Sequence, residues 1–339
     1  MTRASVHSPA LMVDESQHSK PAITVAICTY NGAKRLPAVL DCLKHQKNTE
    51  HLLWEIIVVD NNSTDATADV VRRYQHDWPH HLPLRYYFEA QQGTAFARHA
   101  AITMAHAPLV GFLDDDNLPT PTWVAAAQAF GTSHPRVGAY GSRINGQFES
   151  PLPENFDRIK PFFAITQRGT LPHRYEHCQR VLPPAAGLVV RRQTWLDNVP
   201  EQLILLGASA EQRLAGEDLE ALSHIQAAHW EIWHNPEMVI DHHIPQCRLD
   251  KLYLMDFFRS IGLSRHVTRM LRLCPWQRPF WFALYFLNDG RKALRHLIIY
   301  RQKLRTDIVP ACEMQLYLYS LASPFYIWWL QWLHWFGRR

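Results

Sequence analysis

The chain has 339 residues, of which 47% are hydrophobic and 19% charged, enough for one large domain and an appended segment. Its six cysteines are widely spaced and form no Cys-x-x-Cys pair, which excludes a disulfide framework and a zinc ribbon and agrees with a reducing compartment. Residues 1–20 are polar and lack the charged, apolar and small-residue segments of a secretion signal, so we expect a disordered tail there and no secretion.

The charge is divided unevenly along the chain. Residues 1–245 contain 20 Lys and Arg against 26 Asp and Glu, a formal charge of −6, whereas residues 246–339 contain 15 against 5, a formal charge of +10. A segment as basic as this requires an anionic partner or surface.

Apolar strand-like runs and helix-like segments alternate through the first 120 residues. Runs of β-branched and apolar residues bounded by turn residues indicate strands, and apolar residues spaced three and four apart indicate helices. Four such alternations predict right-handed βαβ units and a mainly parallel sheet flanked by helices, an α/β fold. The expected strands are 23–30, 54–60, 84–88 and 109–113, and the expected helices are 35–47, 65–75 and one that begins at 93–94.

Two of these strands end in carboxylates, at Asp60 and at Asp114–Asp116. Ligands of open α/β sheets bind beyond the carboxyl ends of the strands, and adjacent carboxylates repel one another unless a cation lies among them. Oxygen ligands suit Mg²⁺ and Mn²⁺, which are often shared with the phosphates of a substrate. The strand ends therefore favour a metal and nucleotide site. The alternative at 114–116 is a solvated acidic turn. At 60–65 we expect both an Asx turn that caps a helix and ligand binding, because capping does not preclude a ligand.

The pattern loosens after residue 120. No G-x-G-x-x-G follows the first strand and no G-x-x-x-x-G-K-[ST] occurs, so the usual dinucleotide and P-loop interpretations lose support. A second acidic cluster, Glu217, Asp218 and Glu220, begins a helix, and its carboxylates either complement the helix dipole or serve a site. The further expectations are helices at 123–130, from 193 and at 218–228, strands at 137–142 and 185–192, and a Pro-, His- and Arg-rich loop at 150–184.

Four short motifs lie at the expected strand ends and at the start of this helix. They are V-A-I-C-T-Y-N at 25–31, I-V-V-D-N-N-S-T-D at 57–65, F-L-D-D-D-N at 112–117 and G-E-D at 216–218. In this order and spacing, from about Ala22 to Pro245, the chain resembles family 2 glycosyltransferases of the GT-A fold. The details that look closest to bacterial hormogonium-polysaccharide-type enzymes are G-L-V-V-R-R at 187–192, W-E-I-W-H-N-P at 230–236 and D-H-H-I-P at 241–245.

The resemblance implies transfer of a sugar from a nucleotide-diphosphate donor, expected to be a UDP-sugar, to an acceptor hydroxyl with inversion at the anomeric carbon. It also implies a Mn²⁺ or Mg²⁺ ion that stabilises the leaving diphosphate, and a general base on the opposite face of the sugar. The implied donor-binding residues are Thr29, Tyr30, Asn31, Asp60, Asn62, Arg98, Asp114 and Asp115. The implied metal ligands are Asp116, Asp114 and His242, and the implied base is Asp218, with Glu217 as the second choice.

Some of these assignments have a plain alternative. The family usually has Asn after Arg98, where this chain has His99, so Arg98 alone is carried over. His242 is one of 20 histidines, most of which must be ordinary surface or core residues. Gly187 either lets the backbone approach the acceptor closely or is a plain strand glycine.

The resemblance ends near Pro245, which predicts a GT-A catalytic domain at 21–245 and a basic, aromatic, helical region at 246–339. The apolar stretches at 280–287 and 325–336 are shorter than the roughly 18–20 residues that a membrane-spanning helix needs. Tryptophan and arginine beside such stretches favour a helix that lies in the membrane interface, attracted to anionic lipid. The alternative is a helical hairpin packed on the catalytic domain or on a second subunit.

Together these features predict a metal-dependent, inverting glycosyltransferase of cell-surface polysaccharide biosynthesis. We expect it in the cytoplasm, peripheral on the inner face of the plasma membrane, with a saccharide or a lipid-linked saccharide as acceptor. The basic region has no recognisable nucleic-acid-binding module, so we expect no nucleic-acid partner. One alternative is a nucleotidyltransferase, which usually carries a Gly-rich, basic phosphate loop that residues 23–32 lack. The other is a non-catalytic nucleotide-sugar-binding scaffold, against which the intact carboxylates argue.

Overall fold

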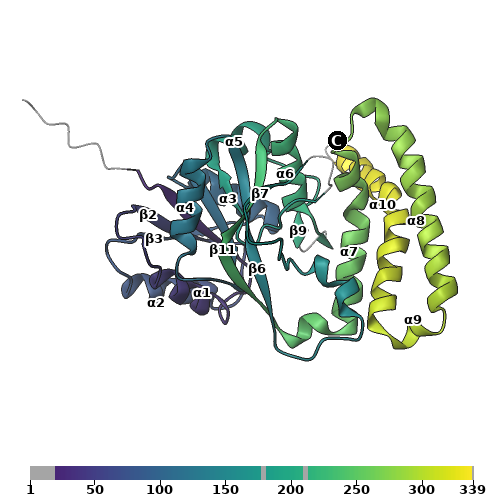
Figure 1. The fold of residues 1–339 in the computed structure, drawn as a ribbon, viewed down its shortest axis with the longest axis horizontal. Helices are drawn as coiled ribbons and strands as arrows, with labels where there is room; N and C mark the ends of the chain where they lie inside the picture. The colour runs from purple at the N-terminus through teal and green to yellow at the C-terminus, as the bar shows by residue number, and fades with distance from the viewer. Residues whose placement is uncertain (1–19, 177–180, 209–212, 338–339) are drawn as a thin grey trace, which may run out of the picture.

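The computed structural model of the chain describes residues 20–176, 181–208 and 213–337. Figure 1 shows a body in which helices flank a sheet, with a group of long C-terminal helices beside it. Apart from Lys20, the tail predicted at 1–20 lies outside the described residues.

A mixed sheet of nine strands lies at the centre of the body as far as the chain is described. Its strands are β1 (Ile23–Thr29), β2 (Trp54–Asp60), β3 (Leu84–Phe88), β4 (Leu109–Asp114), β5 (Asn117–Pro119), β6 (Val137–Phe148), β7 (His173–Arg174), β8 (Val189–Arg191) and β11 (Glu231–Ile244). The strand order is β3-β2-β1-β4-β8-β6-β11-β5, and β7 pairs with β11 outside this path. A separate small sheet pairs β9 (Gly207–Ala208) with β10 (Arg213–Leu214).

The direction of the strands confirms the prediction of a mixed, mainly parallel sheet. β3, β2, β1 and β4 are parallel neighbours, β8 runs antiparallel between β4 and β6, and β6 and β11 are again parallel. The four strands expected in the first 120 residues are present within one residue of their predicted bounds. Every residue of β1 and β2 is buried, as their uninterrupted apolar sequences indicate.

Helices cover both faces of the sheet and form two apolar layers. Ile23, Val25 and Ile27 of β1 pack in the layer on one face, whereas Ala26 and Cys28 pack in the layer on the other. This alternation follows from the two-residue period of a strand. The first layer includes α1 (Leu36–Lys44), α2 (Thr67–His76) and α4 (Trp123–Ser133); the second includes α3 (Thr94–Met104), α5 (Arg192–Asn198) and α6 (Glu217–Ala227).

Two predicted segments differ from the structure. The strand expected at 185–192 is reduced to β8, because Gly187 has a left-handed φ of +65° that a strand does not adopt. The loop expected at 150–184 contains β7 and two 3₁₀ helices, η1 (Phe156–Arg158) and η2 (Lys160–Phe162). Residues 177–180 of that loop lie outside the described part of the chain.

The chain is helical after β11, as predicted. The elements are η4 (Gln246–Leu249), α7 (Lys251–Met270), η5 (Pro275–Gln277), α8 (Arg278–Tyr300), α9 (Lys303–Thr306) and α10 (Ile308–Gly337). α7 and α10 join the body through two apolar clusters, one containing Phe156, Phe258 and Cys312 and the other containing Leu205 and Ile327. α7 and α10 thus pack on the body, as the alternative to membrane attachment requires, while α8, which contains the apolar stretch 280–287, lies on the outer side of the group (Figure 1). None of the helices described here combines the length and the apolar composition that crossing a bilayer requires.

Candidate active site

The register of the parallel strands brings the predicted acidic residues to one edge of the sheet. Thr29 at the end of β1 lies opposite Asp60 at the end of β2, and Cys28 lies opposite Asp114 at the end of β4. The strand order reverses at this point, since β2 and β3 follow on one side of β1 while β4 lies on the other. Such a reversal opens the crevice in which open α/β sheets bind ligands.

Asp115 holds the end of β4 against the loop that follows β1. Its carboxylate is 6% exposed and accepts hydrogen bonds from Nε of Arg35 at 2.7 Å, from Nη2 of the same residue at 2.9 Å and from Oγ1 of Thr29 at 2.5 Å. The bond to Asp115 raises the pKa of Arg35 above its ordinary value. Asp115 and Thr29, which the sequence assigned to donor binding, thus already bind each other, and Arg35 is a participant that the sequence analysis missed.

Replacing Gly32 with Ala is expected to destabilise the fold by about 1–3 kcal/mol, because a side chain there overpacks this corner. A Cβ on Gly32 lies 2.0 Å from Oγ1 of Thr29 and 2.4 Å from Oδ2 of Asp115. Urea denaturation measures the effect as a lower midpoint. The matched control is Gly290→Ala in α8, where no atom lies within 4 Å of the added Cβ and stability should stay constant or rise. Equal stability of Gly32→Ala and the unchanged protein contradicts the packing argument.

Asp116 lies beside an imidazole and a guanidinium from residues more than 120 positions later in the chain. Its Oδ2 is 2.8 Å from Nη2 of Arg248, its Oδ1 accepts a hydrogen bond from Nδ2 of Asn117 at 2.9 Å, and the same oxygen is 3.8 Å from Nε2 of His242. The carboxylate is only 5% exposed. The structure therefore brings together two of the predicted metal ligands, Asp116 from the turn between β4 and β5 and His242 from β11.

The donor groups of Asp116 and His242 suit a divalent cation once Arg248 gives way. Nδ1 of His242 lies 3.1 Å from the carbonyl oxygen of Phe163, which assigns the ring proton to Nδ1. The lone pair of Nε2 then accepts from Nη1 of Arg248 at 3.3 Å, so a cation bound by Asp116 and His242 would replace this guanidinium. Burial lowers the pKa of His242, which favours the neutral, ligating imidazole. The described residues contain no group of three or more His, Cys, Asp and Glu side chains placed to hold a metal by themselves. A cation here would thus need ligands from a substrate, as Mg²⁺ and Mn²⁺ commonly take from phosphates.

A buried arginine links the end of β4 to the start of α6. Arg98 in α3 is 5% exposed; its Nη1 donates to Oε1 of Glu217 at 2.5 Å, and its Nη2 is 3.5 Å from Oδ1 of Asp114. Loss of hydration, reinforced by the charges of Asp116 and Asp115 and opposed by Arg98, raises the pKa of Asp114 to about 6. Arg98 therefore contacts carboxylates, and its predicted contact with the nucleotide stays a prediction.

The two carboxylates that begin α6 differ in their surroundings. Glu217 is 9% exposed and is bound by Arg98, whereas Asp218 is half-buried. Oδ2 of Asp218 accepts the backbone N–H of Ala185 at 3.0 Å, and its Oδ1 accepts that of Leu219 at 2.8 Å. Loss of hydration and the neighbouring Glu217 raise the pKa of Asp218. Among the residues that the structure describes, no cation is bonded to the carboxylate of Asp218, whereas Arg98 is bonded to that of Glu217.

A family model decides which proteins this arrangement belongs with. The model of glycosyl transferase family 2 matches residues 24–182, from β1 through the loop after β6. Residues 24–182 are a family 2 glycosyltransferase domain. The match contains the strand-end residues Asp60 and Asp114–Asp116, while Asp218, His242 and Arg248 follow it in the chain.

Curated glycosyltransferases are similar to part of this domain. Validoxylamine A glucosyltransferase of Streptomyces hygroscopicus subsp. jinggangensis is 38% identical over 32% of this chain and 25% of its own length. Hyaluronan synthase of Pasteurella multocida is 29% identical over 32% of this chain and 11% of its own length. The chain therefore spans at most about a quarter of the length of these two relatives. The closer resemblance to hormogonium-polysaccharide-type enzymes stays a prediction.

A solved structure shares the fold over nearly the whole chain. The mannosyltransferase of Pyrobaculum calidifontis, in complex with GDP-Man and Mn²⁺, has a TM-score of 0.57 and 18% identity, and the match covers 92% of this chain and 88% of that one. At this identity the likeness concerns the fold, which is the α/β GT-A fold that the motifs implied.

The residues expected to bind the nucleoside lie in two loops, one after β1 and one after β2, that hydrogen bonds connect. Asp60 is 2% exposed and accepts from the backbone N–H of Ser63 at 2.9 Å and from the hydroxyl of Tyr86 at 2.8 Å. The Asx turn expected at 60–65 is made by Asp65, whose Oδ1 accepts the N–H of Thr67 at 3.0 Å, whereas the bond of Asp60 reaches three residues on. Tyr86 is a partner that the sequence analysis missed. Asn31 accepts the N–H of Thr64 at 2.8 Å, which ties the two loops together.

The side chains left exposed beside these loops are Tyr30 and Asn62. Tyr30 is 46% exposed, and Asn62 is exposed with a left-handed φ of +62°. Both therefore remain accessible to a ligand at this edge of the sheet, and their contact with a nucleoside stays a prediction.

Gly187 has a packing reason that its sequence did not reveal. A Cβ there would lie 2.0 Å from Cδ1 of Ile240 and 2.4 Å from Oγ of Ser142, and the φ of +65° is itself unfavourable for any other residue. Its close approach is thus to side chains of β6 and β11. The structure gives no support to the predicted approach of this backbone to the acceptor.

Proposed function

We propose that the chain is an inverting, divalent-metal-dependent glycosyltransferase that moves a sugar from a nucleotide-diphosphate donor to an acceptor hydroxyl. The observation that carries the proposal is the separation of two carboxylate sites at one edge of the sheet. Asp116 lies beside His242, while Asp218 lies at the start of α6, and the ion pairs of Arg98 to Asp114 and Glu217 connect the two. One site thus suits a diphosphate and its metal, and the other suits a base.

The base is the first chemical requirement. An acceptor hydroxyl is a poor nucleophile and needs a carboxylate within hydrogen-bond reach to take its proton as it attacks the anomeric carbon. Asp218 is half-buried and bonded to two backbone N–H groups, which orient the carboxylate while leaving it ionisable. Glu217 is already bonded to Arg98, so its carboxylate is less available to an acceptor hydroxyl.

Stabilisation of the leaving diphosphate is the second requirement. Asp116 and His242 are the residues we assign to the metal, which when bound supplies positive charge at the phosphates. In the structure Arg248 provides the cation beside Asp116 at 2.8 Å. Its guanidinium is suited to bind phosphate oxygens. We therefore add Arg248 to the residues proposed for the diphosphate.

The donor is proposed to be a UDP-sugar, and the acceptor a saccharide or lipid-linked saccharide of cell-surface polysaccharide biosynthesis. Part of the chain is similar to a hyaluronan synthase, which supports a role in polysaccharide synthesis. The mannosyltransferase that shares the fold was solved with a nucleotide sugar and Mn²⁺, which supports a nucleotide-sugar donor and a divalent metal. We further propose that the protein acts in the cytoplasm, peripheral on the inner face of the plasma membrane.

The rate of sugar transfer at saturating donor and metal is expected to fall as the pH is lowered and Asp218 becomes protonated. A general base must be deprotonated, and burial and Glu217 raise the pKa of Asp218 above the ordinary carboxyl value of 3.8. Protonation therefore removes the active form at a higher pH than for an exposed aspartate. A pH profile of kcat measures this, with donor affinity followed separately. A kcat that stays constant down to the pH of an unperturbed carboxyl contradicts the assignment.

Purified protein tests the proposal directly. Incubation with a panel of nucleotide sugars, candidate saccharide acceptors and Mn²⁺ should release a nucleoside diphosphate and form a product of inverted anomeric configuration. A product of retained configuration overturns the inverting mechanism. Absence of both hydrolysis and transfer with every donor and acceptor overturns the enzymatic assignment.

A further inference from the structure

The polarity of α8 is the reverse of that of an ordinary surface helix. Its buried residues are Asp289, Ala293 and His296. Its outward side carries large apolar residues that are exposed, namely Phe280, Leu284, Leu287, Leu294 and Ile298. A soluble protein buries the apolar side of a helix and exposes the polar side. The outward side of α8 is thus built for contact with an apolar environment.

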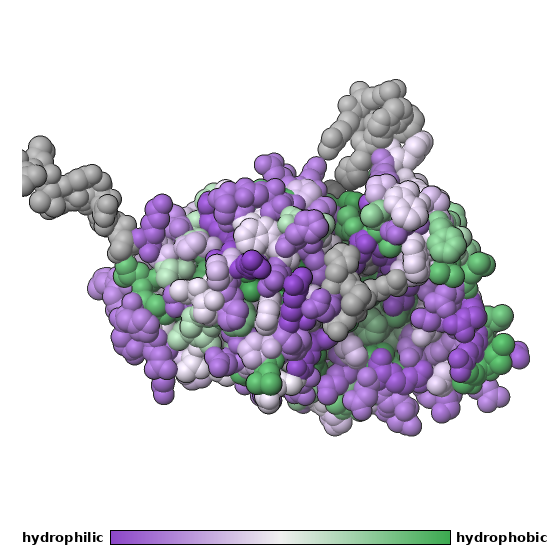
Figure 2. Space-filling view, turned by 45° about the horizontal axis from the view of Figure 1, so that its top comes forward, coloured by the Kyte–Doolittle hydropathy of each residue, from purple (hydrophilic) through white to green (hydrophobic). Residues whose placement is uncertain are grey.

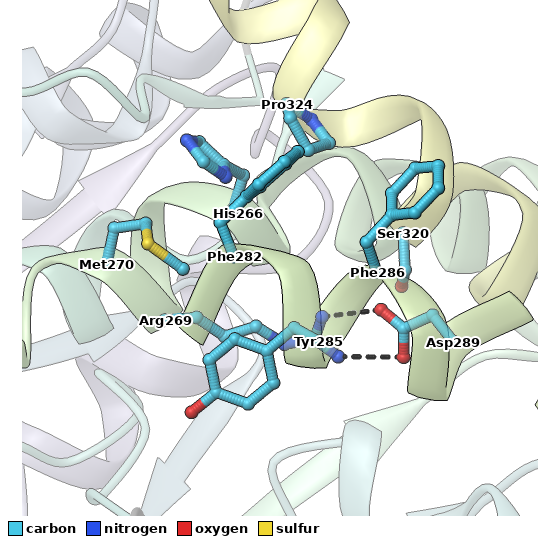
Figure 3. A pocket seen from close by; sticks show the side chains of 9 residues that line it. All are labelled: His266, Arg269, Met270, Phe282, Tyr285, Phe286, Asp289, Ser320 and Pro324. Carbon is cyan, nitrogen blue, oxygen red and sulfur yellow. Dashed lines mark hydrogen bonds and ion pairs between the residues drawn. The ribbon is translucent and has the colours of Figure 1, made fainter. Parts of the chain in front are cut away.

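Polar contacts hold the inner side of α8 in place. Asp289, which interrupts the apolar sequence, is 1% exposed and forms a two-bond ion pair with Arg269 of α7, one bond measuring 3.1 Å (Figure 3). Nε2 of His296 lies 2.9 Å from the carbonyl oxygen of Pro310 at the start of α10. These bonds fix which side of α8 faces outward.

The cavity between α7, α8 and α10 does not explain this arrangement. Its volume is about 10 Å³, space for about one water molecule, and the rings of Phe282, Tyr285 and Phe286 line it (Figure 3). The cavity is therefore too small to hold a ligand between the helices. The exposed apolar residues of α8 lie on its outer side.

The exposed apolar residues of α8 continue onto the aromatic end of α10. Rings from the two helices adjoin, with centroids 5.8 Å apart for Phe282 and Trp328 and 6.2 Å apart for Phe286 and Phe325. These exposed residues together are called the outer apolar face. They are Phe280, Leu284, Leu287, Leu294 and Ile298 of α8 and Phe325, Trp328, Trp329 and Trp332 of α10. Figure 2 shows hydrophobic residues, mixed with hydrophilic ones, along the edge of the molecule where Figure 1 places α8.

The charge around this face is mainly positive. Between residues 278 and 307 there are seven Lys and Arg and two acidic residues, Asp289, whose charge is buried against Arg269, and Asp307, which lies 3.8 Å from Lys303. Arg291 and Arg295 are exposed within the apolar face, and Arg301, Lys303 and Arg305 follow α8. Aromatic residues lie toward one end of the face and basic residues toward the other.

We propose that the outer apolar face binds an anionic membrane surface, with α8 lying in the interface. Apolar side chains enter the acyl boundary, tryptophans favour the headgroup level, and the arginines attract anionic lipid. A second copy of the chain fits less well, because it would bring a face with the same excess of positive charge to the contact. The attachment would bring the candidate active site close to an acceptor that the membrane delivers. This purpose rests on the proposed function, whereas the attachment itself does not.

Flotation of the full chain with vesicles tests the proposal without any turnover, so its result is independent of the glycosyltransferase assignment. The protein should float with phosphatidylcholine vesicles that contain about 30% phosphatidylglycerol and much less with phosphatidylcholine alone. The variant Leu287→Gln/Leu294→Gln/Ile298→Gln should bind about tenfold or more weakly. These side chains are 70%, 60% and 71% exposed, so the folded core should not change. Arg291→Gln/Arg295→Gln should lose about fivefold per arginine.

Matched controls make equivalent changes away from this face. Leu53→Gln/Leu171→Gln replaces two leucines that are 52% and 75% exposed, and Arg72→Gln/Arg73→Gln replaces two exposed arginines of α2. Both controls should float like the unchanged protein. Failure of the unchanged protein to float, or equal flotation of the triple variant, overturns the proposal. So does a dimer in light scattering that the triple variant abolishes, because the face is then a subunit interface.

Discussion

Asp218→Asn is expected to lower the rate of sugar transfer by about 10²–10⁴-fold while leaving the binding of the nucleotide sugar largely unchanged. Asparagine keeps the shape of the side chain and can still accept the N–H groups of Ala185 and Leu219, but it cannot accept the proton of the acceptor hydroxyl. Initial rates at saturating donor, together with donor affinity from titration, separate the two effects.

Glu217→Gln is the matched control for this variant, because it changes the adjacent carboxylate in the same way. Glu217 is bound by the buried Arg98, so its replacement should lower the free energy of unfolding by about 2–4 kcal/mol. The folded variant should retain more transfer than Asp218→Asn. If the folded Glu217→Gln protein is inactive while Asp218→Asn transfers sugar normally, Glu217 is the base and our assignment is wrong.

Asp116→Asn is expected to weaken the dependence on Mn²⁺ and to reduce transfer by about 100-fold or more. The amide has no charge to offer a cation, and His242 alone is a weak site for an ion that prefers oxygen ligands. The measurement is the Mn²⁺ concentration that gives half of the maximal rate. An unchanged half-saturating concentration would falsify the role of Asp116.

Two controls separate loss of the metal from other effects of Asp116→Asn. Arg248→Gln removes the same ion pair but keeps the carboxylate, so the half-saturating Mn²⁺ concentration should not rise. Asp115→Asn removes the neighbouring carboxylate, which binds Arg35 and Thr29. It should lower stability by about 1–2 kcal/mol with the response to Mn²⁺ unchanged. A similar loss of Mn²⁺ dependence in all three variants shows that the substitutions disturbed the surroundings of Asp115 and Asp116 as a whole and not a single metal ligand.

The strand ends that carry the proposed site were predictable from local sequence. Apolar runs that stop at Asp60 and at Asp114 mark buried parallel strands, whose carboxyl ends meet at one edge of a sheet. The prediction needed no knowledge of residues that are distant in the sequence, because the apolar runs of strands and the apolar spacing of helices can be recognised within a few positions. The helix start at Glu217 and Asp218 was predictable for the same reason.

The cations that bind these carboxylates were not predictable. Arg35 meets Asp115 across 80 positions and Arg248 meets Asp116 across 132, and neither arginine belongs to a local pattern that distinguishes it from the others. Arg248 also follows the boundary predicted at 245, so the expected catalytic domain would have excluded a residue of the corner. The division of the chain at 245 stays a proposal.

The C-terminal helices show the same limit in another form. Their basic and aromatic composition indicated either a membrane interface or a packed hairpin; packing on the body is observed for α7 and α10, and attachment of the outer apolar face to a membrane stays a proposal. α7 and α10 contribute Phe258 and Cys312 to a core shared with the body, while α8 turns its apolar side outward. Composition could not divide these roles, because the outward side of α8 depends on the ion pair of Asp289 with Arg269.

By itself the sequence determined the alternating strands and helices, the acidic strand ends and the family, because each rests on residues that are neighbours along the chain. The tertiary structure alone decided which carboxylate has which partner. It placed Arg35 on Asp115, Arg248 and His242 on Asp116, and Arg98 on Glu217. Asp218 is thereby the carboxylate that we propose as the proton acceptor. The physical reason is that the charge of a carboxylate is governed by groups within a few ångströms, and folding brings those groups from positions that the sequence does not relate.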